Sequence, residues 1–129
     1  MARILLIEDD GLLRQVIATA LAGEGHTVRQ AEDGVEGLAC FRAGHFDLVI
    51  TDLIMPRKEG IETIAELRQA NPHLPILAIS GAAQNSGLYL TLARQLGARR
   101  TLQKPFDFIT LTRTVADLLA EAGGSPARC

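Results

Sequence analysis

The chain has few features of a secreted, membrane or nucleic-acid-binding protein. It has only two cysteines, Cys40 and Cys129, which form neither a disulfide framework nor a metal-binding spacing, so we expect free thiols in a reducing cytoplasm. Thirteen basic against fifteen acidic residues give a net charge of −2, so we expect no direct binding of nucleic acid. No apolar run approaches the roughly 20 residues that span a bilayer, and no signal peptide is expected.

The length and composition indicate one soluble globular domain. A chain of 129 residues can bury about two-thirds of its unfolded surface, so it needs no disulfide or metal to hold a core. The residues are 47% hydrophobic and 22% charged, which is ordinary for such a domain. We expect the folded domain over residues 2–122. Residues 123–129, rich in glycine, serine and proline, are expected to be a flexible tail or a truncated linker.

Short apolar runs alternate with longer amphipathic segments five times along the chain. Strands are predicted over residues 3–7, 27–31, 47–51, 75–80 and 100–103. Helices are predicted from Leu12 to about Gly23, over 34–43, between Pro56 and Asn71, over 86–96, and from about Asp107 onward. This alternation is typical of right-handed βαβ units, so we expect an α/β fold with an open parallel sheet and helices on both faces.

Polar residues gather where the predicted strands end, which is where open α/β sheets bind ligands. Only the second strand ends without an obvious functional group. If the strand order is 2-1-3-4-5, the other four strands are contiguous and their ends form one shallow pocket. The polar residues at these ends are Glu8, Asp9, Asp10, Asp52, Ser80 and Lys104.

This set of side chains favours phosphoryl chemistry beside a divalent cation. Crowded carboxylates repel one another, and Mg²⁺ relieves the repulsion by taking oxygen ligands; Asp9, Asp10 and Asp52 are the candidates. A lysine and a hydroxyl supply the positive charge and the hydrogen-bond donor that a phosphoryl group needs. Asp52, alone at the end of a central strand, is best placed to act as a nucleophile that forms an acyl phosphate.

Four segments resemble the receiver domain of two-component response regulators, over about residues 2–122. They occur in the family's order and at fitting intervals, and they are Ile7-Glu8-Asp9-Asp10, Thr51-Asp52-Leu53-Ile54-Met55-Pro56, Ser80-Gly81 and Lys104-Pro105-Phe106. The resemblance implies a flavodoxin-like (βα)5 fold, a doubly wound five-stranded parallel sheet of order 2-1-3-4-5. It also implies a signalling domain rather than an enzyme, one that assists its own phosphorylation and dephosphorylation.

The resemblance implies a role for each matching residue. Asp52 accepts a phosphoryl group from a phosphohistidine on a sensor histidine kinase or a histidine phosphotransfer protein. Asp9, Asp10, Asp52 and the backbone carbonyl of Ile54 hold Mg²⁺. Lys104 pairs with the phosphoryl oxygens, and Ser80 moves to hydrogen-bond them. The peptide bond before Pro105 is cis.

The predicted switch and output surface depart from the family in one position. Thr101 stands where the family usually carries an aromatic residue, so it cannot act as the large rotating side chain that couples hydroxyl movement to aromatic burial. The fourth helix is rich in apolar residues that cannot all face inward, and its region with the fifth strand is the family's output surface. We expect a downstream protein target, a fused output domain or a second copy there, although single exposed apolar residues are also normal.

Three alternatives were weighed against this interpretation. A phosphohydrolase with an aspartyl-phosphate intermediate needs two carboxylates spaced two residues apart, whereas Asp9 and Asp10 are adjacent. A flavodoxin-like carrier needs a Ser/Thr/Gly-rich phosphate loop, which Glu8-Asp9-Asp10 replaces. A receiver that signals without phosphate is disfavoured by the intact acidic and lysine positions. The sequence leaves open whether the chain is a stand-alone regulator or the receiver of a longer protein.

Overall fold

The computed structural model describes residues 2–53, 60–81 and 86–123, with side chains from Thr91 in the last range. The carbonyl of Ile54, residues 124–129 of the expected tail, and Cys129 lie outside the described residues. So do the side chains of Leu88, Tyr89 and Leu90. Cys40 is a free thiol. Within the described ranges, no helix has both the length and the apolar character needed to cross a membrane.

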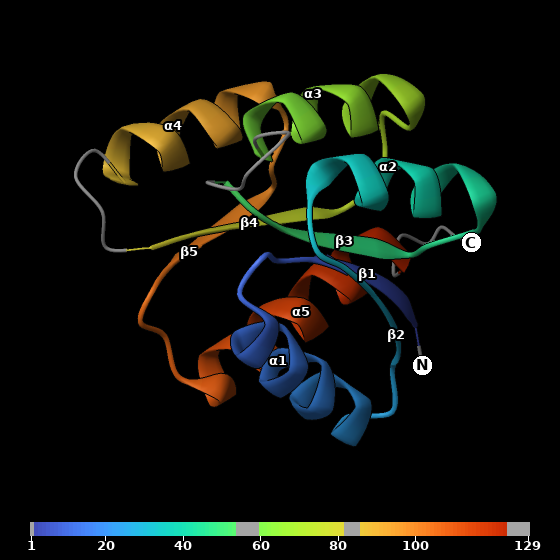
Figure 1. The fold of residues 1–129 in the computed structure, drawn as a ribbon, viewed down its shortest axis with the longest axis vertical. Helices are drawn as coiled ribbons and strands as arrows, with labels where there is room; N and C mark the ends of the chain where they lie inside the picture. The colour runs from blue at the N-terminus through green and yellow to red at the C-terminus, as the bar shows by residue number, and fades with distance from the viewer. Residues whose placement is uncertain (1, 54–59, 82–85, 124–129) are drawn as a thin grey trace.

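Five parallel strands form a single sheet in the order β2-β1-β3-β4-β5, which confirms the predicted topology (Figure 1). The strands are β1 (Arg3–Ile7), β2 (Thr27–Ala31), β3 (Leu48–Asp52), β4 (Ile76–Ser80) and β5 (Arg100–Gln103). Three of them have the predicted bounds, and β3 and β4 each begin one residue later than predicted. The end of β3 at Asp52 brings that carboxylate onto the strand itself.

Helices cover both faces of the sheet, as the strand and helix alternation predicts. They are α1 (Gly11–Gly23), α2 (Gly34–Ala43), α3 (Gly60–Ala70), α4 (Ser86–Leu96) and α5 (Phe108–Gly123). Figure 1 shows α1 and α5 on one side of the sheet and α2, α3 and α4 on the other. From β1 the chain adds β2 on one side and then β3, β4 and β5 on the other, so the strand order reverses between β1 and β3.

Alternate residues of each central strand feed two separate cores. Leu5 and Ile7 of β1 pack with α2 and α3, whereas Ile4 and Leu6 pack with α1 and α5. Every residue of β3 and β4 is buried, whereas the edge strand β2 is mostly exposed. The carboxyl ends of β1, β3 and β4 are thus held by packing on both faces, which fixes the positions of the side chains that follow them.

Gly60 is required where α3 begins against the end of β3. A Cβ atom on Gly60 would lie 2.1 Å from the carbonyl oxygen of Asp52 and 2.6 Å from the Cα of Leu53. The Gly60 N–H donates a hydrogen bond to the Leu53 carbonyl at 3.0 Å. Because those atoms are backbone, they cannot turn aside as a side chain could. The absence of a side chain therefore lets α3 start beside the candidate phosphoacceptor.

Replacing Gly60 with alanine is expected to lower the free energy of unfolding by about 2–3 kcal/mol, since the added methyl group overlaps main-chain atoms. The matched control is Gly23→Ala at the end of α1, where nothing lies within 4 Å of the added Cβ. We expect the control to change stability by less than about 1 kcal/mol, in the stabilising direction that alanine's helix propensity favours. Urea unfolding of both variants measures the difference; equal effects would contradict the proposed overlap.

Candidate functional site

An ion triad joins the ends of three strands. The Nζ of Lys104, after β5, lies 2.9 Å from Glu8 Oε1, after β1, and 3.1 Å from Asp52 Oδ2, at the end of β3. Glu8 and Asp52 are buried, and the Lys104 side chain is 21% exposed. The Lys104 N–H also donates to the carbonyl of Ser80 at 2.7 Å, which ties the triad to the end of β4. One ammonium thus stands between two buried carboxylates.

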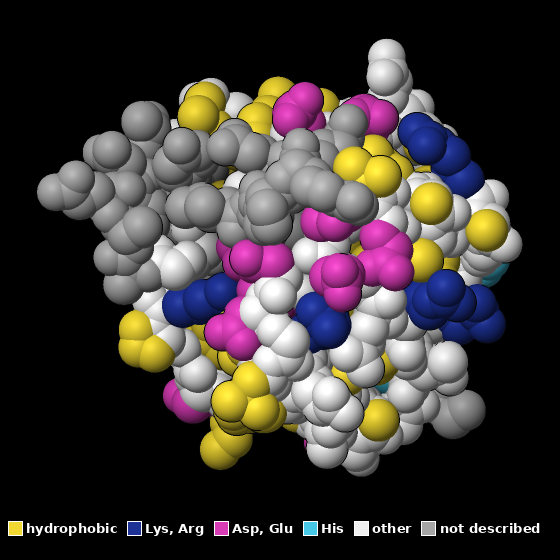
Figure 2. All heavy atoms as spheres, in the orientation of Figure 1, with side chains coloured by type: hydrophobic (Ala, Val, Ile, Leu, Met, Phe, Trp, Pro, Cys, Tyr) yellow, Lys and Arg dark blue, Asp and Glu magenta, His cyan; other side chains and the backbone are white. Residues whose placement is uncertain are grey.

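A third carboxylate makes the site acidic enough to hold a cation. Carboxylate oxygens of Glu8, Asp9 and Asp52 all lie within 4.8 Å of one another, and Asp9 is exposed whereas the other two are buried. Acidic side chains also gather near basic ones on the molecular face shown in Figure 2. Three carboxylates against one ammonium leave negative charge on the open side. An all-oxygen donor set with a solvent-facing member suits a hydrated divalent cation such as Mg²⁺.

Asp10, predicted as a metal ligand, has a different place in the structure. Its Oδ1 accepts a hydrogen bond from the N–H of Leu13 at 3.1 Å, so it is the N-cap of α1. Its own N–H donates to Glu8 Oε2 at 3.1 Å. The structure therefore groups Asp9 and Asp52 with Glu8 rather than with Asp10. The signal was available in the sequence, because Asp10 lies two residues before Leu12, where the helix is predicted to begin, and is a plausible N-cap.

Arg14 fixes the main chain of the acidic turn, a contact that the sequence analysis missed. Its Nη1 donates to the carbonyl oxygen of Glu8 at 2.8 Å, and its Nε donates to Gln30 Oε1 on the edge strand at 3.2 Å. The N–H of Glu8 continues the strand pairing by donating to the Ala31 carbonyl at 3.0 Å. Both backbone groups of Glu8 are thus held, so its carboxylate has little freedom to leave the triad.

Ser80 and Lys104 complete the polar lining that the sequence predicts. The Ser80 Oγ is buried and has no hydrogen-bond partner among the described residues. Ser80 pairs in register with Gln103, the residue before Lys104, so the hydroxyl and the ammonium come from adjacent strands. A buried hydroxyl without a partner is destabilising by about 1–3 kcal/mol, unless an acceptor arrives. The peptide bond between Lys104 and Pro105 is cis, the geometry that the resemblance implies.

Residues 4–116 match the family described as response regulator receiver domain. The chain belongs to this family. Receiver domains are signalling domains of two-component systems, and this assignment confirms the resemblance drawn from the four sequence segments.

Relatives of this receiver domain are mostly longer proteins. The DNA-binding transcriptional regulator NtrC of Rhizobium meliloti is 34% identical over 127 residues, covering 98% of this chain and 26% of NtrC. The response regulator MprA of Mycobacterium ulcerans is 34% identical over 117 residues, covering 91% of this chain and 50% of MprA. The chain thus spans about a quarter to a half of the length of these curated relatives.

Solved structures of receiver domains share the fold. A CheY-like receiver domain protein from Methanospirillum hungatei JF-1 superimposes with a TM-score of 0.91 at 26% identity, covering 97% of this chain and 98% of the other. NtrX from Brucella abortus in complex with ADP gives a TM-score of 0.89 at 28% identity, covering 98% of this chain and 29% of the other. The receiver fold therefore accounts for nearly the whole chain.

The electrostatics of the receiver site favour a proton on Glu8 near neutral pH. Burial raises the pKa of Glu8 to about 7, and the charge of Asp52 adds to the rise, against the opposing contact with Lys104. Burial alone would lower the pKa of Lys104, but its contacts with Glu8 and Asp52 raise that pKa above its usual value. Near pH 7, Lys104 therefore keeps its charge while Glu8 is protonated in about half of the molecules.

Because the pKa of Glu8 rises from 4.5 to about 7 on folding, the native state holds a proton that the unfolded chain releases. This stabilisation is fully present below pH 4.5 and is lost as the pH rises through 7. We expect the wild-type free energy of unfolding, relative to that of Glu8→Gln, to fall by about 1–3 kcal/mol between pH 5 and 8 once solvent screening is allowed for.

Urea titrations of both proteins in chelator, over that pH range, measure this difference. Burial lowers the pKa of His26, and any effect of its titration cancels because both proteins carry it. A difference that stays constant with pH would contradict the raised pKa.

Proposed function

We propose that Asp52 accepts a phosphoryl group from a phosphohistidine on a sensor histidine kinase or a histidine phosphotransfer protein. The observation that supports this most directly is the contact of 3.1 Å between Lys104 Nζ and Asp52 Oδ2, beside the buried Ser80 hydroxyl. The Asp52 carboxylate, the Lys104 ammonium and the Ser80 hydroxyl thus converge at one edge of the sheet, where the strands end. These are the parts that a phosphoryl acceptor needs, since such transfer depends chiefly on positioning and electrostatics.

In the proposed transfer, a carboxylate oxygen of Asp52 attacks the phosphorus atom. The new O–P bond forms as the bond to the imidazole nitrogen breaks, and its electron pair stays on that nitrogen. Lys104 then pairs with a phosphoryl oxygen, and the Ser80 hydroxyl donates to another. A phosphoryl group adds about −1.5 to −2 charges, so these two residues are its natural partners. The product is an acyl phosphate on Asp52 and a free histidine on the donor.

Mg²⁺ fits the acidic residues beside this nucleophile. We propose that Asp9 and Asp52 hold it, with Glu8 as the third carboxylate of the site and the Ile54 carbonyl as a further ligand that the resemblance implies. When bound, Mg²⁺ supplies positive charge that offsets the negative charge of the phosphoryl and carboxylate oxygens. Asp10, the other ligand expected from the sequence, is needed to cap α1.

We propose that phosphorylation changes a protein-contact surface around α4 and β5. The movement of Ser80 toward the phosphoryl group pulls the end of β4 with it, and Thr101 lies on the neighbouring strand, paired with Ala78. Leu92 and Leu96 of α4 are partly exposed, which supports a contact there. The partner is a downstream protein, a fused output domain or a second copy. We place the reaction in the cytoplasm, in line with the free thiol of Cys40.

Phosphorylation at Asp52 is tested by intact mass after incubation with acetyl phosphate and Mg²⁺. We expect the wild type to gain one phosphoryl group, and Asp52→Asn to gain none because it lacks the nucleophile. Asp117→Asn, an exposed aspartate on α5, is the matched control and should behave as the wild type. Chelator should block the gain in the wild type and in Asp117→Asn. Equal labelling of wild type and Asp52→Asn would reject Asp52 as the acceptor.

The metal ligands are tested by the paired variants Asp9→Asn and Asp10→Asn. Each variant removes one negative charge, and the two positions are adjacent in the sequence. Asparagine at position 10 can still cap α1. We expect Asp9→Asn to weaken Mg²⁺ binding by about tenfold or more, since a direct carboxylate ligand is lost. Asp10→Asn should weaken it by no more than about threefold, through the longer-range charge alone. Titration calorimetry measures both; the reverse ranking would restore Asp10 as the ligand.

A further inference from the structure

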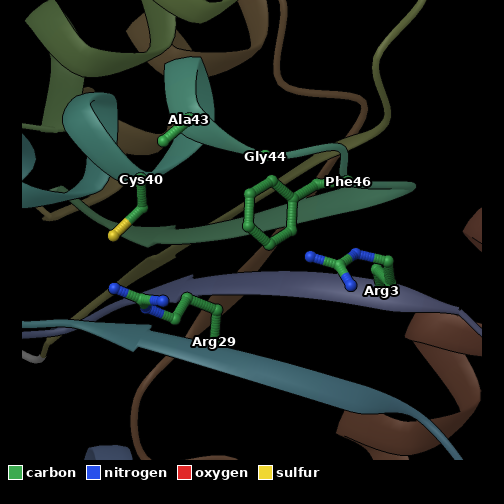
Figure 3. A pocket seen from close by; sticks show the side chains of 6 residues that line it. All are labelled: Arg3, Arg29, Cys40, Ala43, Gly44 and Phe46. Carbon is green, nitrogen blue, oxygen red and sulfur yellow. The ribbon is translucent and has the colours of Figure 1, made fainter.

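A second polar cavity lies between α2 and the strands β1 and β2. It has a volume of about 130 Å³ and is lined by Arg3, Arg29, Cys40, Ala43, Gly44 and Phe46 (Figure 3). Arg3 is the first residue of β1, whereas Glu8 follows the last residue of that strand. The cavity is therefore separate from the acidic site, and nothing in the proposed phosphoryl transfer uses its residues.

Arg3 is held in a defined orientation at one side of the cavity. Its Nε donates to the carbonyl of His45 at 2.8 Å, and its guanidinium carbon lies 5.5 Å from the centre of the Phe46 ring. Its backbone N–H is bonded to Asp47 Oδ2 at 2.8 Å. These contacts use one of the five side-chain N–H donors. Among the described residues, no hydrogen bond takes the terminal nitrogens, which leaves them for a further partner.

Arg29 reaches the cavity from the edge strand β2. Figure 3 shows its guanidinium directed toward the Cys40 sulfur, on the side away from Arg3. None of the lining residues is acidic, so two positive charges share a concave surface without a carboxylate in its wall. Two other arginines, by contrast, have an acidic side chain beside them: Arg42 pairs with Glu66, and Arg100 pairs with Glu121.

We propose that this cavity binds a small phosphate-bearing ligand between Arg3 and Arg29. Guanidinium groups present paired N–H donors that match the spacing of phosphate oxygens, and two of them match the double charge of a phosphate. A cavity of 130 Å³ has room for several waters, and therefore for one phosphate group. Cys40 and Ala43 line the α2 side, so the ligand lies against the thiol.

Cys40 serves as the reporter of occupancy. In a Cys129→Ser background Cys40 is the sole thiol of the chain. The uncharged reagent iodoacetamide alkylates it, and intact mass gives the rate. Inorganic pyrophosphate is the probe, in chelator, against sodium chloride of equal ionic strength. A ligand present at about ten times its dissociation constant should slow the alkylation about tenfold, because only the empty cavity reacts.

Arg29→Gln should abolish this protection, and within the described part of the chain it removes no hydrogen bond or ion pair. The matched control is Arg113→Gln, an exposed arginine on α5, which should keep the full protection. Protection by pyrophosphate that is lost only in Arg29→Gln supports the site. No slowing in the wild-type background, or equal slowing in Arg29→Gln, overturns it. The result is independent of phosphoryl transfer, because Asp52 and Lys104 are unchanged in every variant.

Discussion

The ammonium of Lys104 is the constraint around which the polar end of this molecule is organised. Two buried carboxylates at the ends of neighbouring strands would repel each other strongly in a poorly solvated site. Lys104, at 2.9 Å from one and 3.1 Å from the other, makes their burial tolerable. The residual strain appears as the raised pKa of Glu8, the carboxyl group with the larger burial. The site therefore stores negative charge that a cation or a proton can relieve.

The sheet supplies the geometry that this ion triad requires. Parallel strands place all their carboxyl ends at one edge, and the order β2-β1-β3-β4-β5 sets β1, β3, β4 and β5 side by side. Packing on both faces leaves the central strands little freedom, so Asp52 and Lys104, which are 52 residues apart in the sequence, meet within hydrogen-bond distance. Gly60 and Arg14 then fix the backbone on either side of the acidic residues, one by lacking a side chain and one by bonding a carbonyl.

The fold and most of the site follow from sequence patterns because those patterns are local. Strand and helix periods predict a parallel α/β sheet, and the resemblance to receiver domains implies its strand order. With that order, the polar residue at each strand end predicts the convergence of Asp52, Ser80 and Lys104. The choice between Glu8 and Asp10 is different, because both are acidic and both adjoin Asp9. It depends on which residue begins α1 and therefore on which side chain caps its first turn. The periodicity of apolar residues does not locate the start of a helix to within one residue.

Side-chain contacts away from the strand ends are not predicted by these patterns. Arg14 reaches both Glu8 and Gln30, and the arginine-lined cavity combines residues of β1, β2, α2 and the segment before β3. Nothing in the spacing of Arg3, Arg29 and Cys40 along the chain indicates that they share a surface. Such groupings depend on side-chain direction over the sheet, which only the folded arrangement supplies.

The three carboxylates differ in exposure, and this difference bears on how fast a cation can enter the site compared with how fast Ser80 can move. Asp9 faces solvent while Glu8 and Asp52 are buried beside the ammonium. An ion arriving from solution therefore meets Asp9 first and can exchange its waters there without any element of the core moving. The proposed movement of Ser80, by contrast, would displace a fully buried strand end. Under the proposed function, entry of a cation thus requires no motion of the core, whereas the conformational response requires the slower motions of packed protein.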